Sequence, residues 1–232
     1  MTQAVDAFLA EVIEQWQTAG PLSAMLEIID DVWRTNLDRH EPGTLGDDAM
    51  SLGTLCSRNI MNRCVKHFST HTDGVVARGG LTLEMTYAGR ILHLSKVPSQ
   101  TPSWDPDSID WDASYVRRNG ARANAEAYTP TVGTLFDGTF RDLLSAPVGD
   151  PRDLTFLHLA WQGLSDAETR VFVGFPTTGP LPWSAVTLIH DGGSGGGGVP
   201  APTTPVPALP THDSLAEPTL PLRRRDRGEQ TG

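Results

Sequence analysis

The sequence has few lysines and few cysteines, and it lacks a long apolar run. Lys66 and Lys96 are its only lysines, whereas alanine, glycine, proline and aspartate are plentiful. This composition is typical of a GC-rich genome and predicts a bacterial or phage source. No stretch approaches the roughly 18 uninterrupted apolar residues that a membrane-spanning helix needs. We therefore expect a soluble protein with no membrane partner.

The two cysteines, Cys56 and Cys64, lie in one segment with helical periodicity. At the helical rise their backbones are about 12 Å apart, whereas a disulfide needs about 7 Å or less. Free thiols indicate a reducing compartment, so we expect a cytoplasmic protein. The N-terminal segment mixes acidic with apolar residues and has no basic start, which is unlike a signal peptide.

Outside the glycine-rich run at residues 192–198, the sequence contains no standard catalytic signature. There is no P-loop lysine motif, no H-E-x-x-H and no paired C-x-x-C. The glycine-rich run has no following helix pattern or lysine, so we interpret it as a linker and not as a phosphate-binding loop. No cofactor is predicted. Unrelated folds reach the same chemistry with different residues, so enzymatic activity stays undetermined.

The chain has a formal net charge of −10. The arginines after residue 192 are balanced by carboxylates in the same segment, so the excess negative charge belongs to the preceding body. An acidic body repels phosphate backbones, and we expect no generic nucleic-acid binding by it.

Periodicity divides the body into a helical part followed by strands. Helical spacing of apolar residues covers residues 5–16, 22–37 and 47–68. Period-two alternation predicts a hairpin of residues 81–87 and 90–97, turning at Ala88-Gly89, so that Glu84 lies opposite His93. Further helices are expected from residue 107 or 108 through 116 and near residues 139–144. Asn119-Gly120 could break the first of these, or the alanine-rich stretch to Tyr128 could continue it. Three later strands, at residues 154–161, 170–175 and 183–190, have short connections that force an antiparallel meander.

These elements predict an α+β fold. The N-terminal helices should pack on a largely antiparallel sheet of about five strands, in two layers. We assign residues 1–191 to this single domain. Residues 192–232 are rich in glycine and proline and poor in large apolar residues, which predicts a disordered linker and an arginine-containing tail.

Two pairings of residues offer acid/base or metal chemistry. Glu84 and His93 would form a carboxylate–imidazole pair on the polar face of the hairpin, although such cross-strand pairs also serve as ordinary sheet stabilisers. Cys64, His67 and His71 have ligand-like spacing, with Cys56 upstream. One straight helix cannot wrap a tetrahedral metal ion, so we predict no metal and place both cysteines in the core.

Two further groups are candidate binding residues. Arg117, Arg118 and Arg122 form a basic cluster that could hold a phosphate or carboxylate; alternatively they form a solvated face paired with nearby Asp and Glu residues. The second group should converge at one end of the meander and line a pocket. It consists of Trp161, Gln162, Arg170, His190 and Asp191.

We therefore expect a non-catalytic interaction or regulatory protein. Its partner would be another protein or a small anionic ligand. The alternative is a small hydrolase or nuclease with a nonstandard site. Such a site would be built from Glu84, His93, His158 or His190 and Asp191. Convergence of Glu84, His93, Arg117 and Arg118 on one pocket would favour the enzyme, and dispersal would favour the interaction protein.

Overall fold

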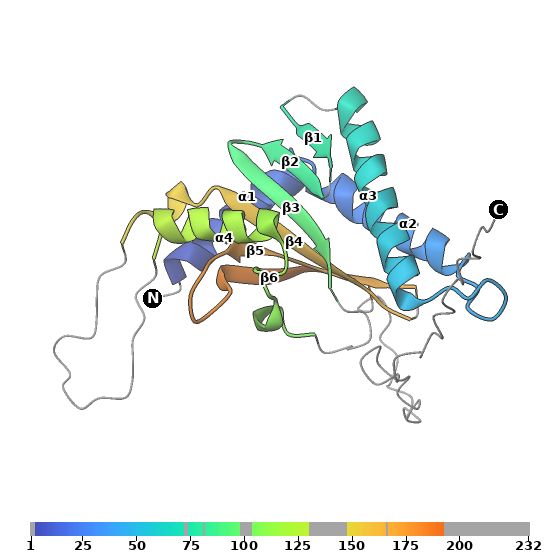
Figure 1. Cartoon of the computed structure of the whole chain (residues 1–232). Helices are drawn as coiled ribbons and strands as arrows, with labels where there is room; N and C mark the ends of the chain where they lie inside the picture. Colours follow the sequence, from blue (N-terminus) through green and yellow to red (C-terminus); the bar gives the residue numbers. More distant parts are fainter. Residues whose placement is uncertain are drawn as a thin grey trace, which may run out of the picture. The chain divides into compact units, whose positions relative to one another are not determined.

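The computed structural model describes residues 3–71, 74–80, 82–97, 104–129, 148–165 and 167–192. In this part of the chain three helices precede the strands and a fourth lies between β3 and β4 (Figure 1). The helices are α1 (Gln3–Thr18), α2 (Leu22–Leu37), α3 (Ala49–His71) and α4 (Tyr115–Ala127). The strands are β1 (Val76–Gly79), β2 (Leu83–Tyr87), β3 (Arg90–Lys96), β4 (Phe156–Gly163), β5 (Thr169–Pro176) and β6 (Trp183–Asp191). Short 3₁₀ turns occur at Pro106–Ser108 and Pro151–Asp153.

The strands form one sheet in the order β1-β2-β3-β4-β5-β6. Neighbouring strands are antiparallel except β3 and β4, which are parallel. The long connection between these two strands contains α4, whereas tight connections join the strands of the meander. Parallel neighbours require such a crossover, so chain connectivity explains the exception.

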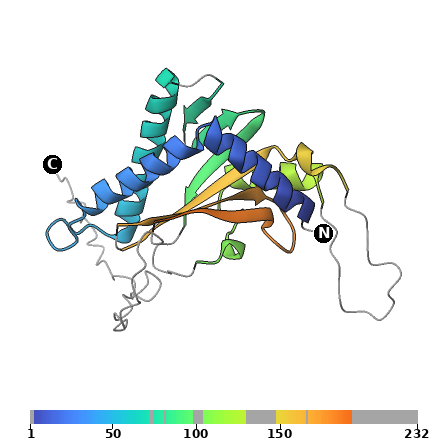
Figure 2. The same cartoon turned by 180° about the vertical axis from the view of Figure 1, so that it is seen from behind.

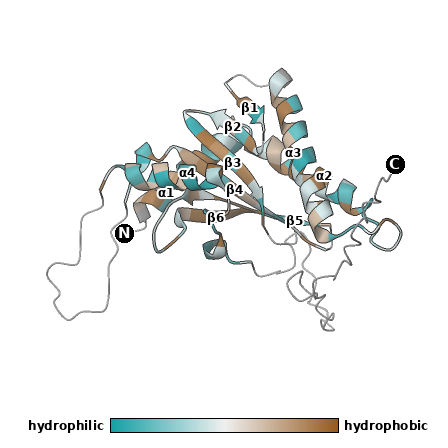
Figure 3. Cartoon of the chain, in the orientation of Figure 1, coloured by the Kyte–Doolittle hydropathy of each residue, from teal (hydrophilic) through white to brown (hydrophobic). Residues whose placement is uncertain are grey.

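Helices lie on both faces of the sheet (Figures 1 and 2). The first two helices cover one face, with α1 contacting β6 and α2 contacting β5, and α4 packs on β4 and β5 from the other side. Hydrophobic residues run along the central strands (Figure 3). The main core joins the buried faces of the first three helices to the sheet; its largest fully buried side chains include Trp16, Trp161 and Phe175.

The structure confirms the α+β class, with N-terminal helices packed on a mainly antiparallel sheet. It also confirms the hairpin, in which Ala88 and Gly89 both have positive φ (48° and 75°) and Glu84 pairs with His93. A turn with positive φ at both central residues matches the twist of the flanking strands. The sheet has a sixth strand, β1, which the sequence did not predict because its residues are mostly exposed and lack alternation. Helix α4 on the second face is a further addition to the expected two layers.

The helix expected between residues 107 and 116 was placed wrongly. Trp111 lies in a loop, where its indole donates a 2.6 Å hydrogen bond to the carbonyl of Pro182 and its ring contacts Trp183 edge to face. Helix α4 begins only at Tyr115 and continues past Asn119-Gly120. A Cβ atom on Gly120 would lie 3.3 Å from the ring of Phe156, so the glycine serves close packing on β4 and does not break the helix.

The predicted tail, apart from Gly192, and the helix expected near residues 139–144 lie outside the described residues. Within the described ranges, no helix is both long and apolar enough to cross a membrane.

One buried amide connects α4 to the sheet. Asn124 is 1% exposed. Its Nδ2 donates to the carbonyls of Phe156, at the start of β4, and Pro176, at the end of β5. Its Oδ1 accepts from the backbone N–H groups of Thr155 and Phe156. A single side chain therefore satisfies four backbone groups on two strands.

Replacing Asn124 by alanine should lower the free energy of unfolding by about 2–4 kcal/mol, because buried backbone groups would lose their partners. Asn119→Ala, an exposed change in the same helix, should alter it by about 0.5 kcal/mol or less. The midpoint of urea unfolding measures both. Similar losses in the two variants would mean that the amide does not hold α4 in place.

Candidate functional site

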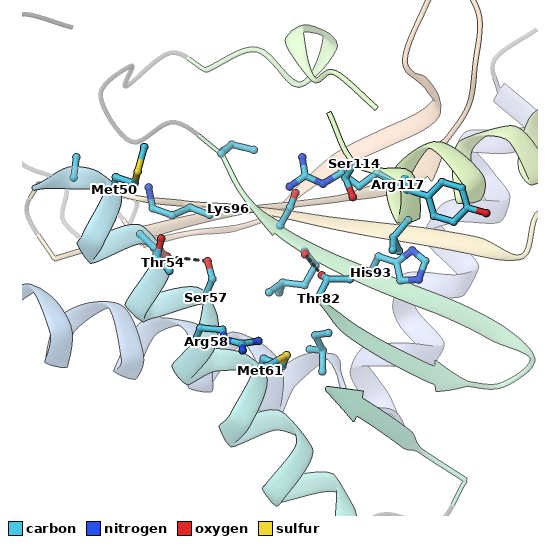
Figure 4. A pocket seen from close by; sticks show the side chains of 18 residues that line it. Met50, Thr54, Ser57, Arg58, Met61, Thr82, His93, Lys96, Ser114 and Arg117 are labelled. Carbon is cyan, nitrogen blue, oxygen red and sulfur yellow. Dashed lines mark hydrogen bonds between the residues drawn. The ribbon is translucent and has the colours of Figure 1, made fainter. Parts of the chain in front are cut away.

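A cavity of about 920 Å³ lies between α3, the end of β3 and the first turn of α4. Figure 4 shows its side chains: Met50, Thr54, Ser57 and Arg58 come from α3, whereas Ser114 and Arg117 lie at the opposite wall. His93 and Lys96 come from β3. Residues distant in the sequence thus line one hollow.

The cavity exists because β2 does not cover the last residues of β3. The β2–β3 pairing runs from Tyr87 opposite Arg90 to Glu84 opposite His93. Beyond His93, the Thr82 side chain donates to the carbonyl of Leu94 at 2.9 Å. The outer edge of β3 then faces α3 across the cavity, where a further strand would otherwise have paired.

Lys96 stands where the end of β3 meets α3. A Cβ on Gly53 would lie 3.3 Å from its Cδ, so glycine leaves room for the lysine stem along the helix. Its Nζ is 5.9 Å from the ring centroids of both Trp33 and Trp161, within cation–π range. Burial lowers the pKa of Lys96 from its usual value. The two indoles thus hold the ammonium at the cavity wall.

Arg117 reaches the cavity from the first turn of α4. Burial lowers the pKa of its guanidinium, and the charge of Asp110 partly offsets this effect. The helix begins after Ser114, whose side chain makes no capping hydrogen bond. The first-turn N–H groups therefore add the partial positive charge of a helix N-terminus to that of the arginine.

His93 lines the cavity and is 5% exposed. Its Nε2 lies 3.7 Å from a carboxylate oxygen of Glu84, which is longer than an ordinary hydrogen bond. Burial lowers the pKa of His93, and Glu84 acts in the opposite direction. Burial is the larger effect, so this imidazole is neutral at neutral pH.

A second imidazole lies behind the cavity wall. His158 pairs with His93 across β3 and β4, is 1% exposed, and has its Nε2 2.7 Å from the hydroxyl of Ser95. Burial lowers the pKa of His158 well below its usual value, and electrostatic interactions with Arg117 and with His93 lower it further. Ser95 itself lines the cavity, so His158 contacts the cavity wall from behind.

The predicted arginine cluster divides between the cavity and the surface. Arg117 lines the cavity, whereas Arg118 lies 4.0 Å from Asp112 and Arg122 lies 3.8 Å from Glu126. The side chains in these two pairs are about half exposed or more. The solvated-face interpretation therefore describes Arg118 and Arg122 but not Arg117, since successive helix residues point in different directions.

The second predicted group is not brought together. Its residues occupy two adjacent rows of paired positions, and such rows point to opposite faces of the sheet. In one row Trp161 is in the core, and His190 lies 3.2 Å from Asp30 of α2. In the other row Arg170 bonds Asp191 at 3.0 Å, and Gln162 is buried. Among them, Trp161 contributes to the cavity only indirectly, through its contact with Lys96.

The cysteines occupy core positions, as predicted. Cys56 and Cys64 are free and fully buried, and burial raises the pKa of these thiols to about 11 and about 12. No group of three or more potential ligands among the described residues is placed to hold a metal ion. The side chain of His71 lies outside the described part.

Sequence reasoning missed Lys96, Arg58, Ser57 and Thr54 as site residues. The available signal was the rarity of lysine: one of only two lysines ends a strand at the cavity. Arg58 carries no such signal, and its Nη1 donates to the carbonyl of Gly80, which ties α3 to the β1–β2 connection.

Comparison with known proteins gives no match: no family model fits the chain, and no curated protein or solved structure is significantly similar to it.

The low pKa of His158 predicts a loss of stability in mild acid. The unfolded imidazole binds a proton near pH 6.5, whereas the folded one, beside Arg117, His93, Ser95 and two tryptophans, does not. Stability is thus fully present above pH 6.5 and falls below it, by up to about 1.4 kcal/mol per pH unit for one proton.

His158→Gln, which removes the titrating ring and keeps a polar partner for Ser95, should show a shallower decline between pH 6.5 and 5. Urea unfolding at stepped pH values measures the slopes of the two proteins. Equal slopes would mean that His158 is protonated in the fold.

Proposed function

We propose that this protein is a non-catalytic binding protein for a small anionic ligand, held in the cavity between α3, β3 and α4. The observation that carries the proposal is the charge of the lining. Arg58, Lys96 and Arg117 line the cavity, and none of the described lining residues is Asp or Glu. Such a lining contrasts with a chain whose net charge is −10.

The chemistry of the donors supports an anion as the ligand. A guanidinium offers a planar fork that matches phosphate or carboxylate oxygens, and an ammonium adds a point charge. The uncapped N-terminus of α4 adds about 0.3–1 kcal/mol for a negative group near it. Asp110 and Glu84 act on Arg117 and His93 but do not line the cavity.

The imidazoles favour binding over turnover. A general base works best when its pKa is close to the operating pH. Burial lowers the pKa of both His93 and His158, and the charge of Arg117 lowers that of His158 further. Both rings are therefore weak bases at neutral pH.

Arg117→Ala should weaken binding of pyrophosphate about 10- to 100-fold, because a charge-assisted hydrogen-bond donor is lost. Arg117→Lys should restore only part of the affinity, since an ammonium lacks the fork. Isothermal titration calorimetry at low ionic strength measures these affinities.

Arg118→Ala is the matched control. It removes the same charge from the adjacent position, where the guanidinium pairs with Asp112 outside the cavity lining. It should change the affinity by about twofold or less. Equal losses in both variants would indicate unspecific charge attraction, and absence of pyrophosphate binding to the unaltered protein would refute the proposal.

A second candidate function is a small hydrolase or nuclease that uses Glu84 and His93. The observation in its favour is that this pair lies side by side, with His93 on the cavity wall. The nearby contact between Ser95 and His158 adds a hydroxyl next to an imidazole, an arrangement that some nucleophilic enzymes use.

Hydrolysis measurements distinguish the binding protein from the hydrolase. The binding proposal expects no hydrolysis of p-nitrophenyl phosphate or of a short single-stranded DNA above the buffer rate. The hydrolase predicts activity that falls at least about 100-fold in His93→Ala, as expected for loss of a general acid or base. Glu126→Gln, on the exposed face of α4, serves as the unaffected control. Activity with this pattern would replace the binding proposal.

A further inference from the structure

The cavity is larger than an inorganic anion requires. Its volume of about 920 Å³ lies within the roughly 300–1,000 Å³ of sites that hold small organic molecules. A phosphate group bound at Arg117 would leave most of this space unfilled. The anionic group is therefore expected to be attached to an organic body.

The rim of the cavity carries exposed apolar side chains on both walls. Met50 on α3 and Tyr115 at the start of α4 are each 71% exposed, and both line the cavity. The guanidinium of Arg118 lies 5.8 Å from the centre of the Tyr115 ring, within cation–π range. An exposed phenol ring near cationic side chains offers a stacking surface for a flat aromatic group.

The positions of Tyr115 and Arg117 suit a ligand that carries both an anionic group and a ring. Ser114, Tyr115, Val116 and Arg117 follow one another and all line the cavity, so the cavity meets α4 at its end. Tyr115 and Arg117 thus line the same hollow from one helical turn. A ligand with a phosphate at one end and a ring at the other can contact both.

Hydroxyl groups line the part of the cavity across from α4. Thr54, Ser57 and Thr82 all line the cavity. The hydroxyls of Ser57 and Thr82 donate to backbone carbonyls, which leaves their oxygens free to accept. Such groups suit the hydroxyls of a sugar. A long acyl chain would instead need a continuous apolar surface, which these polar side chains interrupt.

We propose that the ligand is a nucleoside 5′-phosphate, with its phosphate at Arg117 and its base stacked on Tyr115. This inference rests on the proposed function and specifies the chemical class of the ligand. The hydroxyls on α3 and near β3 then face the ribose.

Calorimetric titrations with adenosine 5′-monophosphate, ribose 5-phosphate, adenosine and pyrophosphate test the inference on the full chain. The nucleotide should bind about 10-fold or more tightly than ribose 5-phosphate, because base stacking on an aromatic side chain contributes that much. Tyr115→Ala should remove this advantage and leave ribose 5-phosphate binding within about twofold, whereas Tyr115→Phe should keep it. Leu181→Ala, another exposed apolar side chain outside the lining, is the control and should change neither affinity.

The outcomes distinguish the two proposals. If ribose 5-phosphate and the nucleotide bind equally, or if Tyr115→Ala leaves their ratio unchanged, the nucleotide inference is wrong while anion binding stands. If adenosine binds as tightly as the nucleotide, the phosphate is not recognised and the inference also fails. If none of the phosphorylated probes binds, the proposed function itself is wrong.

Discussion

The parallel pairing of β3 with β4 joins the two halves of the sheet, and the cavity depends on it. It aligns His93 with His158 and Lys96 with Trp161. The same pairing requires a crossover connection, and that connection contains α4. The side chain of Asn124 then holds α4 over β4 and β5 through four hydrogen bonds to backbone groups. Arg117 reaches the cavity only because this helix is held there.

The electrostatics of the site follow from partial burial of cations. Lys96 and Arg117 each have a pKa that burial lowers, which means that desolvation penalises their charge. An anion entering the cavity would supply the opposite charge at close range in a medium of reduced dielectric constant, where the attraction is stronger than in water.

Local signals in the sequence predicted the elements, and long-range packing decided the rest. Ala88-Gly89 sets the hairpin register, so the Glu84–His93 pairing was predictable from the turn alone. The cavity was not predictable, because it depends on three long-range features. The last residues of β3 are not paired with β2, α3 lies close to β3, and α4 packs on the face of the sheet opposite α1 and α2. No residue pattern encodes these three features locally. For the same reason the arginine cluster was identified correctly as basic, but only the structure separates Arg117 from its neighbours.

Because of the two buried histidines, a fall in pH should lower the stability of the fold and raise the affinity of the cavity for an anion. Protonating His158 would place a charge beside Arg117 in the interior, so the low pKa of His158 opposes protonation in the folded state and stability declines in acid. His93 lines the cavity, and a bound anion would raise its pKa by favouring the charged form. Ligand affinity should then increase as pH falls toward the range in which the fold weakens. A bound anion offsets the loss, because a ligand that binds only the folded state stabilises it in proportion to its affinity.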